Sequence, residues 1–169
     1  MKVDDITLYL DMDGVIANFS KEFSKYDANV DDKRKFAQAV MDDRIFEKLE
    51  MMPDAQELLN KVKHLHNSGM RVEMLTSMGT FDEVRGAEAK RQKLLWLKEH
   101  NINYPANFVR TKSEKADYAH SKAILIDDSS GCITPFIRKK GYGILHRESS
   151  TTNRILDVII ERIRMDDKK

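Results

Sequence analysis

The chain has 169 residues, of which 41% are hydrophobic and 34% are charged, and its formal net charge is +1. This length predicts one domain with a real hydrophobic core, and the near-balance of charge argues against strong electrostatic attraction to nucleic acid or an anionic membrane. A single cysteine, Cys132, excludes an internal disulfide, and no apolar run approaches the roughly 20 residues that span a bilayer. Since the N-terminus also carries no signal-peptide pattern, we expect a cytoplasmic protein, either a monomer or a homodimer.

Five short apolar runs predict β-strands that are buried on both faces. They cover residues 6–10, 72–75, 107–110, 123–126 and 142–145. Apolar residues at helical spacing predict helices over residues 54–67, 80–100, 133–140 and 152–164. Strands that alternate with helices predict an α/β fold with a parallel sheet and right-handed crossovers.

Residues 17–51 interrupt this alternation, because no strand-like run lies between Ile16 and Met52. The segment is too long for an ordinary loop, and it holds several aromatic residues among many charges. We therefore predict a small helical cap of residues 17–51, inserted into an α/β core of residues 1–16 and 52–169. A cap directly after the first strand is well placed to act as a lid over a site. We expect Phe23 and Phe36 to form the cap's own core.

Asp11, Asp13 and Gly14 follow the first predicted strand and form the most informative stretch of the chain. Glycine allows the chain to turn sharply at this point. Ligands of α/β proteins bind at the carboxyl ends of the strands, which is where this acidic pair lies. Because two neighbouring carboxylates repel each other, the pair indicates a functional site in preference to a solvated acidic turn.

Further polar side chains follow the second and fourth predicted strands, and lysines come shortly before the fourth. These residues are Thr76, Ser77, Lys112, Lys115, Asp127 and Asp128. Parallel strands present their carboxyl ends at one edge, so we expect these groups to gather beside the acidic turn. Carboxylates without histidine or cysteine partners suit a hard cation, chiefly Mg²⁺, while hydroxyl and ammonium groups suit phosphate oxygens. A carboxylate can also attack phosphorus, and a second one nearby can act as general acid and base.

In this chain order, the residues resemble the motifs of the haloacid dehalogenase (HAD) superfamily of phosphohydrolases. The chain is most similar to the 5′(3′)-deoxyribonucleotidases, including phage-encoded members. The run DMDGVIANF at residues 11–19 resembles their opening motif almost residue for residue, and FEKLEMMPDA at residues 46–55 resembles their return from the cap. LTS at residues 75–77 and LIDD at residues 125–128 resemble their second and last motifs. The resemblance implies a Rossmann-like HAD core and a magnesium-dependent phosphomonoesterase that hydrolyses (deoxy)nucleoside monophosphates through an aspartyl-phosphate.

The resemblance also implies roles for the acidic residues. Asp11 is expected to be the nucleophile, and Asp13 is expected to be the general acid and base. Mg²⁺ is expected to bind Asp11, the backbone carbonyl of Asp13, and one or both of Asp127 and Asp128, with Asp128 favoured.

Phosphate and base contacts are implied in the same way. Phosphate would be bound by Thr76, Ser77 and Lys115, with Lys112 as the alternative lysine, and the nucleobase would contact Phe19 and Phe46. We place the basic stretch formed by Arg85, Lys90, Arg91 and Lys93 on a solvent-exposed helix face.

Several alternative functions stay open at this stage. The same chemistry could act on the phosphate ends of nucleic acid or on a small phosphorylated metabolite, although a closed cap favours a mononucleotide because it excludes long chains. A signalling receiver uses similar residue types, but there the acidic pair belongs to the first strand, whereas here it follows the fourth. An inactive binding protein is disfavoured because every acidic position of the motifs is intact.

Overall fold

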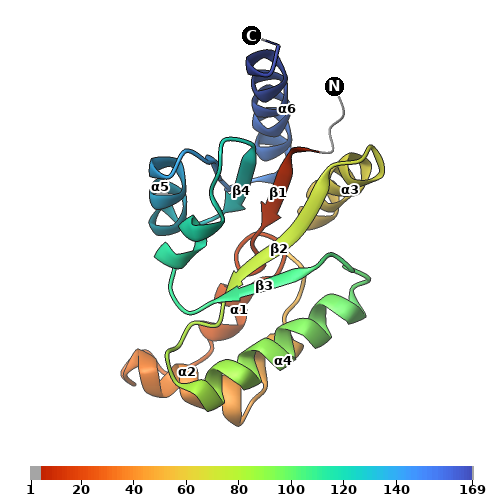
Figure 1. Ribbon diagram of the computed structural model, residues 1–169. Coiled ribbons are helices and arrows are strands. Elements are labelled where there is room, and N and C mark those ends of the chain that lie inside the picture. The colour runs from red at the N-terminus through yellow and green to blue at the C-terminus, as the bar shows by residue number, and fades with distance from the viewer. Residues whose placement is uncertain (1–4, 169) are drawn as a thin grey trace.

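Residues 5–168, which the computed structural model describes, contain a five-stranded parallel sheet flanked by helices (Figure 1). The strands are β1 (Thr7–Leu10), β2 (Arg71–Ser77), β3 (Ala106–Val109), β4 (Ala123–Asp127) and β5 (Tyr142–Leu145). Their order across the sheet is β3-β2-β1-β4-β5, and each neighbouring pair is parallel. The predicted α/β fold is therefore confirmed, with β1 at the centre of the sheet.

The helices differ from the predicted ranges mainly at their ends. They are α1 (Phe19–Phe23), α2 (Asp32–Met41), α3 (Ala55–Asn67), α4 (Glu83–Glu99), α5 (Ser130–Arg138) and α6 (Ser149–Asp166), with short 3₁₀ helices η2 (Ile45–Glu47) and η3 (Ser113–Tyr118). α4 begins later than expected because Asp82 caps it, accepting a hydrogen bond from the Arg85 amide at 2.8 Å. α5 and α6 begin three residues earlier than expected, since their first residues, 130–132 and 149–151, precede the apolar residues whose helical spacing gave the prediction.

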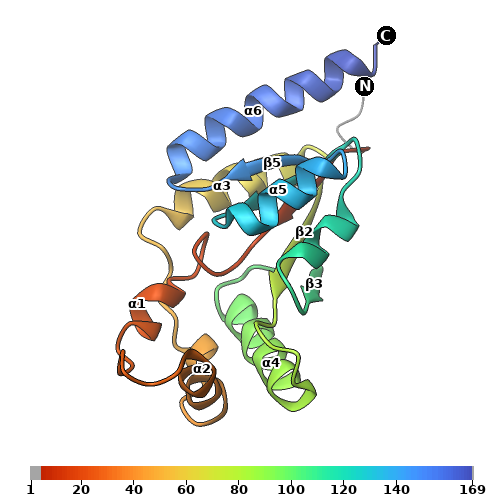
Figure 2. The ribbon, with the colours of Figure 1, turned by 90° about the vertical axis from the view of Figure 1, so that its left-hand side faces the viewer.

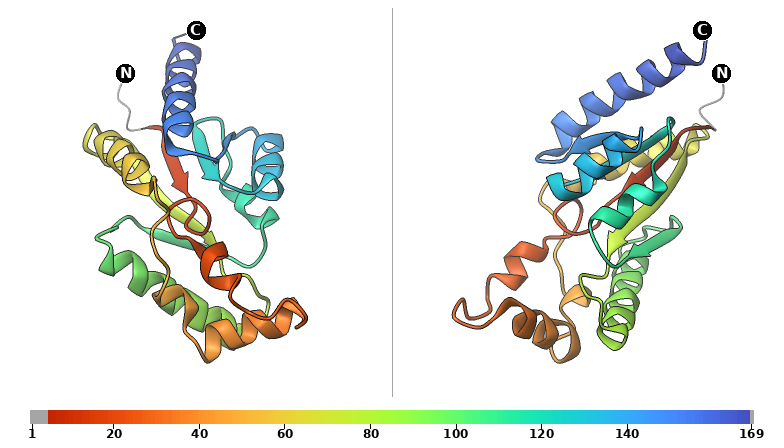
Figure 3. Two further views of the ribbon diagram at one scale, coloured as in Figure 1. Left: turned by 180° about the vertical axis from the view of Figure 1, so that it is seen from behind. Right: turned by 60° about the vertical axis from the view of Figure 1, so that its left-hand side comes forward.

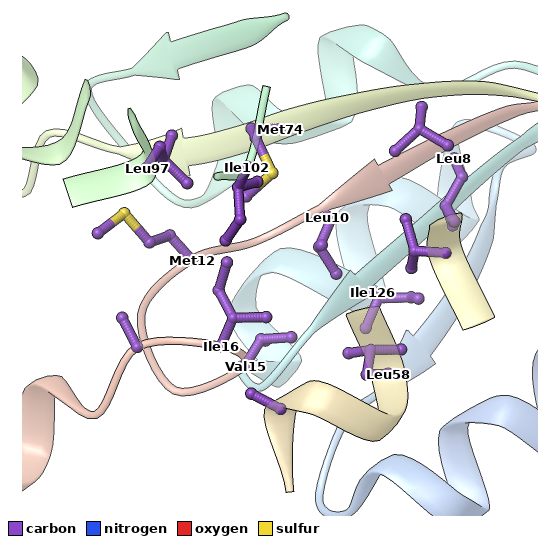
Figure 4. Close-up of a cluster of buried hydrophobic side chains, with 14 of the residues drawn as sticks. Leu8, Leu10, Met12, Val15, Ile16, Leu58, Met74, Leu97, Ile102 and Ile126 are labelled. Atoms are coloured by element: carbon purple, nitrogen blue, oxygen red, sulfur yellow. The ribbon is translucent and has the colours of Figure 1, made fainter. Parts of the chain in front are cut away.

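The core lies on both faces of the sheet, because successive side chains of a strand point to opposite sides. Leu8 and Leu10 of β1 belong to a large buried cluster with side chains of α3, α4 and α6, part of which is shown in Figure 4. Tyr9 belongs to a smaller cluster with Phe136 and its neighbours on α5. A central strand enclosed in this way holds the residue after it, Asp11, in a fixed place.

The segment between β1 and α3 is helical, as expected, and it leaves and rejoins the rest of the chain at neighbouring points. The Asn18 amide donates to the Glu50 carbonyl at 2.8 Å, and the Met52 amide donates to the Ile16 carbonyl at 2.8 Å. In Figures 1 to 3, α1 and α2 lie beyond the carboxyl end of β1, on the same side as α4. α2 and η2 both pack against α4.

Phe23 and Phe36 contact other rings of their own segment: Phe23 stacks on Phe19 with 5.0 Å between ring centres, and Phe36 meets Phe46 edge-on at 6.2 Å. Phe23 and Phe36 are partly buried and pack against the same large cluster that includes the β1 side chains. The helical segment therefore shares its core with the sheet.

The two ends of the described chain meet at the amino edge of the sheet. The Lys122 ammonium group lies 2.7 Å from the Asp167 carboxylate and 3.5 Å from the Asp5 carboxylate. Among residues 5–168, no helix is long and apolar enough to cross a membrane.

Candidate active site

The acidic turn is built as the sequence indicates, directly after β1. The Asp11 amide donates to the Ile126 carbonyl of β4 at 3.0 Å, so the residue is anchored to the neighbouring strand. Gly14 adopts a φ of 77°, and its amide donates to the Ala17 carbonyl at 2.9 Å. A side chain at this position would collide with Asp128, because a Cβ atom would lie 2.5 Å from the Asp128 Cγ atom. Glycine is required here both for the backbone angle and for the close approach of Asp128.

Three carboxylates meet at the carboxyl edge of the sheet. Oxygen atoms of Asp11, Asp127 and Asp128 all lie within 4.8 Å of one another. Burial, together with the charges of Asp11 and Asp127, raises the pKa of Asp128 to about 6. Burial and the charge of Asp11 also raise the pKa of Asp127. Carboxylates forced together in this way fit a divalent cation, because its charge removes their repulsion and carboxylate oxygen is the ligand type that Mg²⁺ prefers. The cluster could therefore hold a metal ion.

Lys115, from η3, reaches into this acidic cluster. Its Nζ atom lies 2.6 Å from Asp127 Oδ2 and 2.9 Å from Asp11 Oδ1, and the side chain is almost fully buried. Burial alone would lower the pKa of Lys115, but the two carboxylates raise it above its ordinary value. Lys112, the alternative lysine, is exposed and lines the rim of the same pocket. Of the two, Lys115 is the one in direct contact with the acidic cluster.

The two hydroxyl residues at the end of β2 lie at different depths. Thr76 is fully buried, whereas Ser77 is partly exposed and lines the pocket that contains the acidic cluster. Ser77 Oγ accepts a hydrogen bond from the Gly79 amide at 3.0 Å and donates one to the Arg110 carbonyl at 3.3 Å. Both residues are thus held at the carboxyl edge, as the parallel sheet predicts.

Asp13 is separate from the acidic cluster, and its partner is Lys93 of α4. The Lys93 Nζ atom donates to Asp13 Oδ2 at 2.6 Å, to Thr76 Oγ1 at 2.9 Å and to the Ser77 carbonyl at 2.7 Å. It also lies over the Phe46 ring, 4.5 Å from the ring centre. Burial raises the pKa of Asp13, although the nearby Lys93 charge lowers it in part.

The prediction that Lys93 lies on a solvent-exposed helix face was wrong. Its side chain is only 1% exposed, whereas Lys90 and Arg91 of the same stretch are exposed as expected. Ala89, Trp96 and Leu97 are buried, and they lie four residues before and three and four residues after Lys93. That helical spacing was visible in the sequence and would have placed Lys93 on the inner face of α4.

A cavity of about 300 Å³ joins these groups. Its lining includes three lysines, Lys93, Lys112 and Lys115, and the carboxylates of Asp11, Asp13, Asp127 and Asp128. We call this cavity the acidic pocket. Phe19 and Phe46, which the sequence predicted as site residues, also line it. Thr76 does not, because Lys93 lies between Thr76 and Asp13.

A second cavity, of about 500 Å³, opens beside the first and is mostly apolar. We call it the aromatic groove; its aromatic lining residues are Phe19, Phe23, Phe36 and Phe81. Phe19, Phe36 and Gly79 line both cavities, so the two lie next to each other. The Phe19 ring stacks with Phe23, at 5.0 Å between ring centres, and with Phe46, at 5.5 Å.

Comparisons with known proteins add support at the level of the fold. No protein-family model matches the chain, and no curated protein matches it. Among solved structures, the chain is similar to a hydrolase from Streptococcus pneumoniae TIGR4 known from its crystal structure, with a TM-score of 0.51 and 16% sequence identity. The match covers 93% of this chain and 100% of that one. At this identity the likeness shows that the two chains share a fold.

Proposed function

We propose that this chain is a magnesium-dependent phosphomonoesterase of the HAD type that hydrolyses (deoxy)nucleoside monophosphates. The observation that carries the proposal is the meeting of Asp11, Asp127 and Asp128 with the buried Lys115 at one edge of a parallel sheet. Three carboxylates suit a divalent cation, and a cation together with an ammonium group suits a phosphate dianion. The resemblance of residues 11–19 to the deoxyribonucleotidase motif supplies the substrate class.

In the proposed chemistry, Asp11 is the nucleophile and Asp13 is the general acid. The Asp11 carboxylate forms a new bond to phosphorus while the bond from phosphorus to the leaving oxygen breaks, and Asp13 gives its proton to that oxygen. Asp13 then takes a proton from water, which attacks phosphorus and releases Asp11 and inorganic phosphate. Magnesium, when bound by Asp11, Asp127 or Asp128 and the Asp13 carbonyl, would offset the repulsion between the Asp11 carboxylate and the phosphate.

The other site residues receive supporting roles. Lys115 would neutralise charge on the phosphoryl oxygens, and the Ser77 hydroxyl on the pocket wall would turn from the Arg110 carbonyl to donate its hydrogen bond to one of them. Catalysis of phosphoryl transfer depends mainly on positioning and on such electrostatic stabilisation of the transition state. Thr76 does not line the pocket, so it would act indirectly, by accepting a hydrogen bond from Lys93.

The nucleobase would lie where the acidic pocket meets the aromatic groove. Phe19 and Phe46 line the pocket, and Phe19 also lines the groove, whose surface is mostly apolar. An apolar cavity next to a phosphate site suits a flat, weakly polar leaving group. On this proposal, residues 17–51 form the cap over a core of residues 1–16 and 52–169.

Phosphate release from a panel of deoxy- and ribonucleoside monophosphates, with a 5′-phosphorylated oligonucleotide beside them, tests the proposal. Wild-type protein in Mg²⁺ should release phosphate from deoxymononucleotides in preference to the oligonucleotide. Asp11→Asn should abolish turnover while the thermal unfolding midpoint stays within a few degrees. Near-normal activity of Asp11→Asn would refute the nucleophile assignment, and preference for the oligonucleotide would favour an end-processing enzyme with the same aspartates.

A further inference from the structure

We propose that Lys93 is a positioning residue, which fixes the Asp13 carboxylate in the one orientation that serves the leaving group. The inference rests on the proposed function, because it assigns a task within that reaction. Lys93 is a buried lysine that was expected to be solvent-exposed, and the proposed chemistry gives it no contact with the reacting groups.

The contacts of Lys93 leave its ammonium group no freedom. An ammonium group has three donor hydrogens, and Lys93 has three acceptors within 3 Å: Asp13 Oδ2, Thr76 Oγ1 and the Ser77 carbonyl. Thr76 and Ser77 belong to β2, so the lysine ties the side chain of the acidic turn to the neighbouring strand. The Phe46 ring covers the same atom from the side of the helical cap.

The two oxygens of the Asp13 carboxylate are consequently unequal. Oδ2 is held by Lys93, whereas Oδ1 is buried and has no hydrogen-bond partner within residues 5–168. A buried carboxylate oxygen without a partner costs about 1–3 kcal/mol, so its persistence in a pocket wall calls for an explanation. We assign Oδ1 as the oxygen that exchanges a proton with the leaving group and with water.

Direct phosphate binding by Lys93 is the competing interpretation, and the geometry argues against it. Its side chain is 1% exposed, and each of its donors already has a partner. Lys115 is also buried, but it contacts Asp11 and Asp127, the residues that surround the reacting phosphorus in the proposed chemistry. The two lysines therefore have different roles: Lys115 contacts the phosphate, and Lys93 holds the Asp13 carboxylate.

The test compares two substrates that differ in the need for a proton. Phenyl phosphate and p-nitrophenyl phosphate have leaving groups of nearly equal shape, but phenoxide is a far poorer leaving group and depends more on a general acid. Lys93→Met removes the ammonium group while keeping an unbranched apolar side chain. Lys98→Met, on the exposed face of the same helix, is the matched control.

General acid catalysis contributes about 10²–10⁴ to a rate, and a misplaced acid should lose part of it. We therefore expect kcat/KM, which covers only the steps up to release of the leaving group, to fall about 10- to 100-fold for phenyl phosphate in Lys93→Met, against less than 3-fold for p-nitrophenyl phosphate. Lys98→Met should match the wild type on both substrates. Equal losses on the two substrates would overturn the inference, because a residue with a merely structural role does not distinguish leaving groups.

A double variant keeps the inference testable if Lys93→Met does not fold, since that change leaves Asp13 as an unpaired, partly buried charge. Asp13→Asn with Lys93→Met removes both charges together. If Lys93 acts through Asp13, the double variant should be no less active than Asp13→Asn alone. A further loss of tenfold or more in the double variant would show that Lys93 acts elsewhere. A wild type that hydrolyses neither compound would instead refute the proposed function.

Discussion

Replacing Gly14 by alanine tests whether the acidic turn shapes the candidate metal site. Gly14 has a φ of 77°, and an added Cβ atom would lie 2.5 Å from the Asp128 Cγ atom. The Asp128 carboxylate must then move away from Asp11 and Asp127. We expect Gly14→Ala to weaken both the fold and the binding of Mg²⁺.

The loss of stability can be separated from the loss of metal binding. An L-residue in the left-handed region costs about 1–2 kcal/mol. For a domain of this size, about 2–4 °C is lost per kcal/mol, so the unfolding midpoint should fall by about 2–8 °C. Gly69→Ala is the matched control, because Gly69 also has a positive φ, of 100°, but follows α3 at the opposite edge of the sheet.

The assay is thermal unfolding with and without Mg²⁺. A ligand present at about 100 times its Kd stabilises the folded state by about 2.7 kcal/mol. If the displaced carboxylate weakens binding by about 10- to 100-fold, that gain falls to about 1.4–0.4 kcal/mol in Gly14→Ala. Gly69→Ala should keep the wild-type gain. An undiminished gain in Gly14→Ala would refute the reasoning that Asp128 must approach the turn for the ion to bind.

Three further predictions follow from the pKa values and the cavities. A proton on Asp128, whose pKa is about 6, competes with the cation, so Mg²⁺ affinity measured by calorimetry should fall about tenfold from pH 7 to pH 5; a constant affinity would contradict this. Burial lowers the pKa of His146, so the unfolded chain binds a proton near pH 6.5 at which the folded protein stays neutral. The free energy of unfolding in urea should therefore decline as the pH falls from about 6.5 through the folded pKa, and it should decline less in His146→Gln. Phe19→Leu should raise KM about tenfold for a deoxynucleoside monophosphate, the equivalent of about 1.4 kcal/mol of ring contact, and leave KM for p-nitrophenyl phosphate unchanged; equal shifts would indicate packing alone.

The sheet could be predicted because its strands are short, largely apolar segments that follow turn residues, whereas the apolar run at residues 94–97 of α4 lies within a longer helical pattern. Its parallel arrangement then placed Asp11 and Asp127 at one edge, although many residues separate them in the sequence. The approach of these carboxylates follows from topology alone, without any knowledge of side-chain packing. Element ends were less predictable, since the first residues of α5 and α6 precede the apolar residues at helical spacing.

The burial of Lys93 was not predicted, because its charge was given more weight than its position on the inner face of α4. Gln92 and Lys93 are both buried on a helix whose other charged residues are mostly solvent-exposed, so the apolar stripe of α4 is interrupted where it meets the site. A buried lysine is stable only beside its acceptors, and those belong to the turn after β1 and to the end of β2. No local pattern in the sequence reports such a partnership.

The ion pairs of Lys122 with Asp5 and Asp167 have a practical consequence for handling the protein. Both ends of the described chain emerge on the side of the sheet away from the acidic pocket, as Figure 1 shows for the position of α6 relative to α1. A tether for surface immobilisation, or a fluorescent reporter fused at either end, would therefore leave the mouth of the pocket facing solution. Neighbouring ends also make the chain suited to circular permutation, in which a short linker joins them and new ends are opened in a surface loop.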